Sequence, residues 1–114
     1  MQTRLVLCTC PDIAVAETLA RRVVAEHLAA CVNLVPQMRS IYRWQGEIHD
    51  DAEVLLLIKT TAARFDALRQ RLLELHPYEL PEIVAVNIDS GLPRYLDWIA
   101  QHARPDTPQP TEKP

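Results

Sequence analysis

His76-Pro77-Tyr78-Glu79-Leu80-Pro81-Glu82 separates a helical pattern from a strand pattern in the second half of the chain. Each proline fixes its own φ at about −65° and biases the residue before it towards extended backbone. His76 and Leu80 are therefore expected to be extended, and the preceding helix is expected to end near Leu75. What remains is a short, stiff loop with an imidazole, a phenol and two carboxylates. Rigidly held loops often carry binding groups, so this loop is the first candidate for function.

The segments on either side of this loop predict a helix, a strand and a second helix. Apolar residues recur at helical spacing between charged ones, as in an amphipathic helix, at Phe65, Leu68, Leu72 and Leu75. Ile83 to Ile88 is apolar, ends at Asp89-Ser90-Gly91 and predicts a strand. Pro93 suits the first turn of a further short helix, whose apolar positions are Leu92, Tyr95, Leu96 and Ile99.

The first half of the chain predicts a strand, a helix and a pair of strands. Leu5 to Thr9 is a short apolar run, typical of a buried strand. Asp12 suits the N-cap of a helix that continues through the alanine-rich stretch to Ala30. Gly46 supplies a chain reversal, after which Glu53 to Thr60 predicts a nearly continuous apolar strand.

The segment from Val32 to Trp44 alternates with a period of two and predicts an unusually long strand. It would reach about 43 Å, whereas a domain of ~100 residues has a radius of gyration of only ~13 Å. The strand therefore either bends, with Pro36 as the candidate position, or leaves its own sheet. An exposed strand of this kind invites aggregation unless another chain pairs with it, so we expect an oligomer.

The resulting order is βαββαβ with a short C-terminal helix, an α+β sandwich of the ferredoxin-like type. Right-handed crossovers place both main helices on one face of the antiparallel sheet. The other face then needs a cover, for which a second subunit is the natural candidate. This domain is assigned to residues 1–103. Residues 104–114 are rich in proline, lack large apolar side chains and predict a disordered tail.

Composition excludes several functional classes. The net charge of −3, without a basic patch, argues against a nucleic-acid partner. The apolar runs are far shorter than the ~20 residues of a membrane span, and no charged-then-apolar leader begins the chain, so we expect a cytoplasmic protein without a membrane partner. Two glycines cannot build a glycine-rich phosphate loop, and three cysteines suggest reduced thiols rather than a disulfide framework.

Six blocks of the sequence resemble the CutA divalent-cation tolerance family, over about Leu5 to Ile99. They are Cys8-Thr9-Cys10-Pro11-Asp12, Leu28-Ala29-Ala30-Cys31-Val32-Asn33, Ile41-Tyr42-Arg43-Trp44-Gln45-Gly46, Ile58-Lys59-Thr60-Thr61, His76-Pro77-Tyr78-Glu79-Leu80-Pro81-Glu82 and Tyr95-Leu96-Asp97-Trp98. The resemblance implies a ferredoxin-like fold, a tight homotrimer similar in architecture to PII signalling proteins, and a link to tolerance of copper and other divalent metals.

Cys8 and His76 are the predicted metal ligands. On the residues alone, Cys8 is either a soft thiolate ligand for copper or a small buried hydrophobe, which is the commoner role of a free cysteine. His76 either ligates a metal or caps carbonyls at the negative end of a helix. The resemblance implies the ligand role for both. Some relatives carry a second histidine where this chain has Leu75, so a further ligand would have to come from Cys10 or Glu79.

The other cysteines have open interpretations. Cys10 lies two residues from Cys8 and shares its face if the strand continues that far, so it either adds a second thiolate or ends the strand without a function. Cys31 matches a cysteine of the family and is interpreted as a packing residue. The chain lacks the Cys-x-x-Cys spacing of structural zinc sites.

A second candidate site is a cleft between subunits, lined by Tyr42, Trp44, Lys59, Tyr78 and Glu82. The PII-like architecture suggests that such a cleft holds a small anion, although aromatic side chains are also what an obligate interface buries. Acid and base chemistry by the loop is disfavoured because no nucleophile and orienting partner accompany it. We therefore predict a non-enzymatic, trimeric, copper-binding tolerance protein, with a PII-like small-molecule sensor or signalling scaffold as the alternative.

Overall fold

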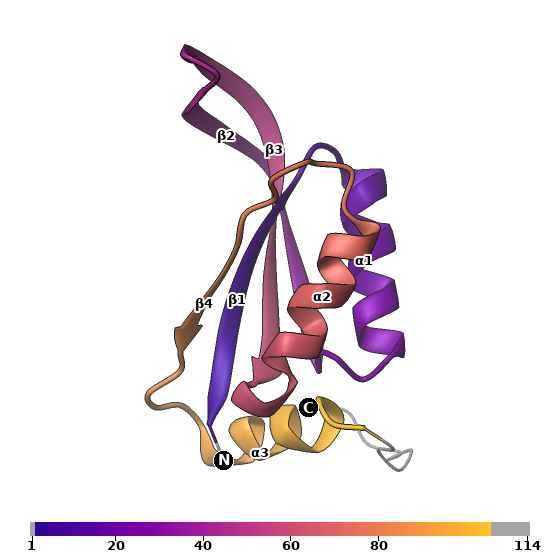
Figure 1. Ribbon diagram of the computed structural model, residues 1–114. Coiled ribbons are helices and arrows are strands. Elements are labelled where there is room, and N and C mark those ends of the chain that lie inside the picture. The colour runs from indigo at the N-terminus through magenta and orange to yellow at the C-terminus, as the bar shows by residue number, and fades with distance from the viewer. Residues whose placement is uncertain (1, 106–114) are drawn as a thin grey trace.

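The computed structural model describes residues 2–105, which form the predicted βαββαβ order followed by a third helix (Figure 1). One antiparallel sheet has the strand order β2-β3-β1-β4. The strands are β1 (Thr3–Cys10), β2 (Cys31–Trp44), β3 (Glu47–Thr61) and β4 (Ile83–Asn87). The helices are α1 (Ile13–Ala25), α2 (Phe65–Leu75), preceded by the 3-10 turn η1 (Ala62–Arg64), and α3 (Pro93–His102). The predicted ferredoxin-like fold is confirmed.

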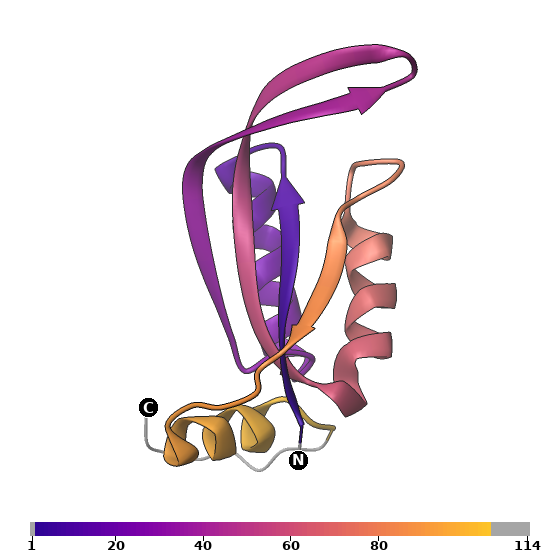
Figure 2. The ribbon, with the colours of Figure 1, turned by 90° about the vertical axis from the view of Figure 1, so that its left-hand side faces the viewer.

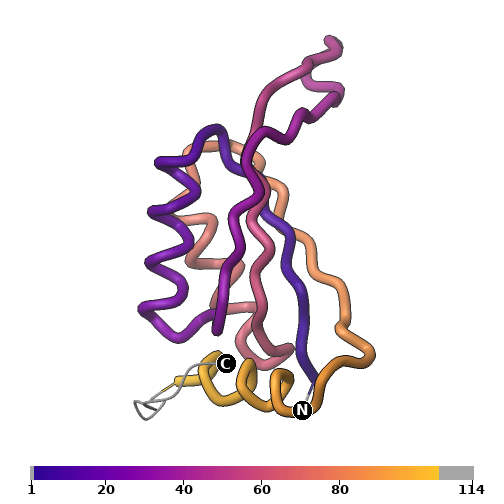
Figure 3. The backbone as a smooth tube through the Cα atoms, turned by 180° about the vertical axis from the view of Figure 1, so that it is seen from behind, coloured from indigo at the N-terminus to yellow at the C-terminus, as the bar shows by residue number. Residues whose placement is uncertain are grey.

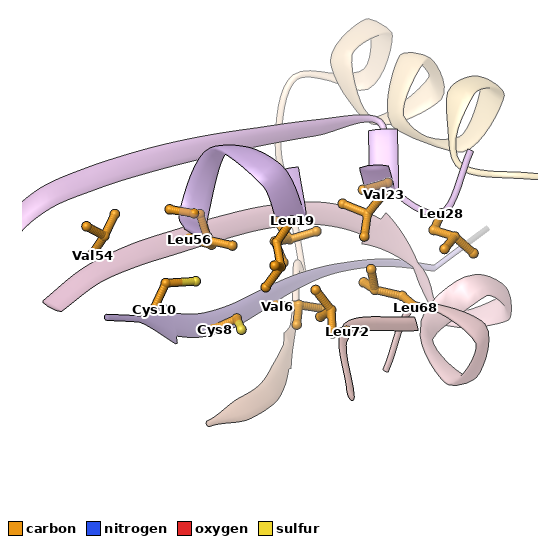
Figure 4. Packing of buried hydrophobic residues seen from close by; sticks show 13 residues of the cluster. Val6, Cys8, Cys10, Leu19, Val23, Leu28, Val54, Leu56, Leu68 and Leu72 are labelled. Carbon is orange, nitrogen blue, oxygen red and sulfur yellow. The ribbon is translucent and has the colours of Figure 1, made fainter. Parts of the chain in front are cut away.

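The two main helices cover one face of the sheet, as the right-handed crossovers predict (Figure 1). Buried side chains of β1 and β3 meet those of α1 and α2 in the core (Figure 4). The core members with the largest buried side chains are Val6, Leu19, Val23, Leu56, Ile58, Leu68 and Leu72. Helix α3 instead crosses the end of the sheet, near the start of β1 (Figure 3). Its Ile99 packs there with Ala30 and Ala103.

The opposite face of the sheet carries apolar side chains that no helix among residues 2–105 covers. Cross-strand neighbours on this face are Leu57, Leu7 and Val84 in one row and Leu5 and Val86 in the next. Val84 and Val86 are about half exposed, and Leu5, Leu7 and Leu57 are partly exposed. An apolar sheet face of this kind is normally packed against another layer.

Strands β2 and β3 extend beyond the rest of the domain as a two-stranded hairpin (Figure 2). Their register shifts between Val35 and Met38, which confirms the bend predicted at Pro36, and Gln37 takes a positive φ of 65° there. The hairpin turns at Gln45 and Gly46, both with positive φ, as a tight two-residue turn requires. Strand β3 begins at Glu47, earlier than the predicted Glu53. The added residues are mostly polar because the projecting part has no core to face.

Helix α1 ends at Ala25, so the predicted continuation to Ala30 is wrong. His27 adopts a left-handed φ of 58°, and the amides of Leu28 and Ala29 both bond to the carbonyl of Val23. Leu28 continues the helical period in sequence but is buried in the returning loop, which explains the overestimate. The predicted end of α2 at Leu75 is confirmed, with His76 in extended backbone.

Two further predictions concern the C-terminal tail and the absence of a membrane-spanning helix. Residues 106–114 lie outside the described residues, so the predicted disorder of the 104–114 tail stays a prediction. Within residues 2–105, no helix has the length and apolar character needed to cross a bilayer.

Candidate metal centre

Strand β1 and the end of α2 bring Cys8, Cys10 and His76 together. Because β1 continues to Cys10, the two cysteines share a face, as predicted, and lie among the buried side chains on the helix-covered side of the sheet (Figure 4). His76 follows α2 directly, and all three residues are buried. One ligand atom from each lies within 4.8 Å of the others. Among residues 2–105, these three form the group of His, Cys, Asp or Glu side chains whose donor atoms lie close enough together to hold one metal ion.

The spacing of these atoms nearly suits a shared ion. Metal ions lie ~2.3 Å from thiolate sulfur and ~2.0–2.1 Å from imidazole nitrogen, so two ligands on opposite sides of one ion are at most about 4.6 Å apart. The donor atoms of the cluster, no more than 4.8 Å apart, are close to this separation. Two sulfurs and an imidazole are donors that suit copper better than magnesium or calcium.

His76 uses both ring nitrogens in hydrogen bonds within the protein. The backbone N–H of Tyr78 donates to Nδ1 over 3.1 Å, so Nδ1 carries a lone pair and the ring proton lies on Nε2. Nε2 then donates to the carbonyl oxygen of Thr9 over 2.8 Å. The imidazole ties the loop after α2 to the end of β1, rather than capping helix carbonyls. It has no free lone pair for a metal in this arrangement.

The two thiols differ in acidity. Their mutual hydrogen bond, together with burial, raises the pKa of Cys8, whereas the same hydrogen bond lowers the pKa of Cys10. A hydrogen bond from one thiol to the other stabilises the thiolate that accepts it, so the pair loses its first proton more readily than its second.

A cleft of about 520 Å³ lies next to this cluster, between the hairpin and the loop after α2. Four of the predicted cleft residues line it, namely Tyr42, Trp44, Tyr78 and Glu82. The exposed Glu79, considered above as an extra ligand, lines the same cleft and is not in the metal cluster within residues 2–105. The lining has Arg43 against three carboxylates, Glu53, Glu79 and Glu82. This lining belongs to a single chain, so the cleft between subunits and the small anion suggested for it stay predictions.

Lys59, the remaining predicted cleft residue, lies elsewhere. It is six residues beyond Glu53 on β3, a separation of about 20 Å along the strand. Its Nζ bonds to Asn33 and lies 3.9 Å from the sulfur of Cys31. Lys59 and Cys31 therefore form a contact between the far ends of β2 and β3, away from the metal cluster.

The sequence analysis missed Glu53 and Thr9, which connect the cleft to the cluster. Glu53 is only 8% exposed, and the Tyr78 hydroxyl donates to its Oε2 over 2.6 Å. Burial, with this hydrogen bond, raises the pKa of Tyr78. Glu53 directly precedes the apolar run Val54 to Ile58, and a carboxylate at the start of a buried strand could have identified it as a site residue. Thr9 contributes a backbone carbonyl, which no side-chain pattern reveals.

Comparison with known proteins identifies the relatives of this chain. Residues 4–102 match the family described as CutA1 divalent ion tolerance protein. The divalent-cation tolerance protein CutA of Thermus thermophilus is 54% identical over 97 residues, covering 85% of this chain and 94% of that protein. Human protein CutA is 47% identical over 93 residues, which cover 82% of this chain and 52% of the human protein, so the chain spans about half its length.

Solved structures agree with this relationship. The T. thermophilus CutA1 structure superposes with a TM-score of 0.88 at 51% identity, covering 90% of this chain and 99% of that one. CutA1 from Oryza sativa gives a TM-score of 0.89 at 38% identity, with 91% and 95% covered. On its sequence and its fold, the chain belongs to the CutA1 divalent ion tolerance protein family.

Proposed function

We propose that this chain binds copper, or a related soft metal ion, at Cys8, Cys10 and His76 and so contributes to metal tolerance. The observation that carries the proposal is the convergence of three buried donor atoms within 4.8 Å of one another. The family description, a divalent ion tolerance protein, is consistent with it. That description names no reaction, and we propose a non-enzymatic role.

A cation at this cluster would be bound by two thiolates in an apolar core, an arrangement that is stable only with the positive charge between them. Cys8 and Cys10 would supply these thiolates, and His76 would supply the third donor once it leaves its present hydrogen bonds. Soft sulfur donors select Cu(I) in particular, which reduced thiols also stabilise.

We further propose a homotrimer in the cytoplasm. The uncovered apolar row around Leu7 and Val84 offers a surface for a neighbouring subunit, and the projecting β2–β3 hairpin offers free strand edges. A reducing compartment keeps the thiols available for metal. A solved relative from Archaeoglobus fulgidus is described as periplasmic. Sedimentation equilibrium at micromolar concentration tests the assembly, and a monomer would refute it.

The test of metal binding is an anaerobic competition titration of the reduced protein against a Cu(I) chelator. Cys8→Ser and Cys10→Ser should each weaken Cu(I) binding by at least about tenfold, because each removes one sulfur donor. Cys31→Ser is the matched control and should bind as the unmodified chain does. Binding that is unchanged in the Cys8 and Cys10 variants would refute the proposed centre.

The alternative function is a small-molecule sensor or scaffold that uses the cleft beside Tyr42, Trp44 and Tyr78. Its size, about 520 Å³, is that of a small-ligand site. The acidic lining favours a neutral or cationic ligand over an anion. A thermal-shift screen of metal-free protein against amines and sugars tests this function. Stabilisation that Trp44→Ala abolishes, without any copper binding, would favour the sensor over the metal centre.

A further inference from the structure

The metal cluster and the cleft share their supporting contacts. His76 belongs to the cluster, and its two hydrogen-bond partners, Thr9 and Tyr78, both line the cleft. The rings of His76 and Tyr78 are also in contact, with centroids 4.7 Å apart. Any rearrangement of the imidazole therefore acts directly on one wall of the cleft.

His76 cannot ligate a metal without releasing Tyr78. If Nδ1 is the ligand, its lone pair is no longer available to the Tyr78 N–H. If Nε2 is the ligand, its proton must move to Nδ1. The bond to Thr9 is then lost, and the Nδ1 proton faces the Tyr78 N–H, donor against donor. In both cases the Tyr78 amide loses its acceptor.

Tyr78 connects His76 to Glu53, another residue that lines the cleft. Its hydroxyl donates to Glu53, a buried carboxylate on β3, over 2.6 Å. The Tyr78 side chain is thus held at one end by Glu53 and at the other by the contact with His76. Loss of the second contact frees the loop to move about Pro77, while Glu53 opposes the movement.

We infer that metal binding at the cluster and the shape of the cleft are linked through His76 and Tyr78. This inference rests on the proposed metal centre and adds that the cleft reports whether the centre is filled. Linkage is reciprocal. A molecule that binds the metal-free form of the cleft therefore weakens metal binding, and the metal weakens binding of that molecule by the same factor.

The test is nuclear magnetic resonance of the reduced protein with and without one equivalent of Cu(I), which is diamagnetic. Without metal, the ring nitrogens of His76 should show the tautomer protonated at Nε2. With Cu(I), the His76 ring nitrogens should shift and the Tyr78 amide should exchange with solvent about tenfold faster or more. The amide of Ala103, which bonds to the Ile99 carbonyl on α3 in a separate hydrophobic cluster, is the internal control.

A variant provides an independent measurement. Tyr78→Phe removes the tie to Glu53 and keeps the backbone N–H, so it should raise Cu(I) affinity by up to about thirtyfold, the value of one hydrogen bond to a buried charged group. Tyr95→Phe, on α3, is the matched control and should leave the affinity unchanged. Cu(I) bound with His76 and Tyr78 signals unmoved would overturn the linkage and leave a two-thiolate centre intact. Failure to bind Cu(I) at all would overturn both the linkage and the proposed function.

Discussion

Two tyrosines of this protein donate to carboxylates in contrasting surroundings, and the contrast predicts different effects on stability. Tyr78 donates to Glu53 over 2.6 Å, and Glu53 is 8% exposed. Tyr42 donates to Asp51 over 2.5 Å, and both are exposed. Tyr78→Phe leaves a buried carboxylate without its donor, whereas Tyr42→Phe leaves a carboxylate that water can solvate.

The magnitudes follow from burial. A buried charged group that loses its partner costs about 1.5–3 kcal/mol, so Tyr78→Phe should lower the free energy of unfolding by about 2 kcal/mol. An exposed pair contributes about 0–1 kcal/mol, so Tyr42→Phe should cost no more than about 0.5 kcal/mol. The assay is equilibrium urea unfolding of metal-free protein at one fixed concentration, because assembly links stability to concentration. Equal losses in the two variants would refute the assignment of Glu53 as a buried, Tyr78-dependent carboxylate.

Three further predictions test local structure by the same urea assay. Asp12→Ala should cost about 1 kcal/mol, because the Asp12 side chain caps α1 by accepting from the Val15 amide over 2.9 Å; an unchanged midpoint would contradict the cap. Gly46→Ala should also cost about 1 kcal/mol, entirely from its φ of +82°, since a Cβ there meets nothing within 4 Å; a neutral result would contradict that turn. The hydrogen bond from Arg71 lowers the pKa of Glu26. The Glu26 carboxylate should therefore stabilise the protein above pH ~4.3, and this stabilisation should be lost as the pH falls through the lowered pKa. Glu26→Gln should therefore lower the urea midpoint at pH 7 and converge with the unmodified chain in acid, and a pH-independent difference would exclude the ion pair.

Local patterns predicted most of the elements of this fold. The two prolines after Leu75 correctly predicted the end of α2. The period-two segment Val32 to Trp44 predicted the length of β2 and gave a bend at Pro36 as one of two alternatives, and the register shift lies there. The end of α1 was missed because Leu28 fits the helical period while serving as a buried loop residue. The apolar pattern predicts which side chains are buried, but it does not predict whether the backbone there is helix or loop.

The candidate site was predicted in part. Strand alternation placed Cys8 and Cys10 on one face, and the family resemblance paired His76 with Cys8 as metal ligands. The contact of His76 with Thr9 arises from the packing of α2 on the sheet, which no local pattern encodes. Within one chain, β3 carries Lys59 about 20 Å from Glu53, so its predicted place in a cleft between subunits depends on an assembly that no local pattern describes.

The measurement that tests the central claim most directly is copper X-ray absorption of the Cu(I)-loaded, reduced protein. The proposed centre predicts two sulfur neighbours at about 2.3 Å and one nitrogen neighbour at about 2.0 Å. Cys10→Ser should remove one sulfur neighbour, and Cys31→Ser should change nothing. A copper environment of nitrogen and oxygen alone, or one that Cys10→Ser leaves unchanged, would contradict the assignment of Cys8, Cys10 and His76 as the metal centre.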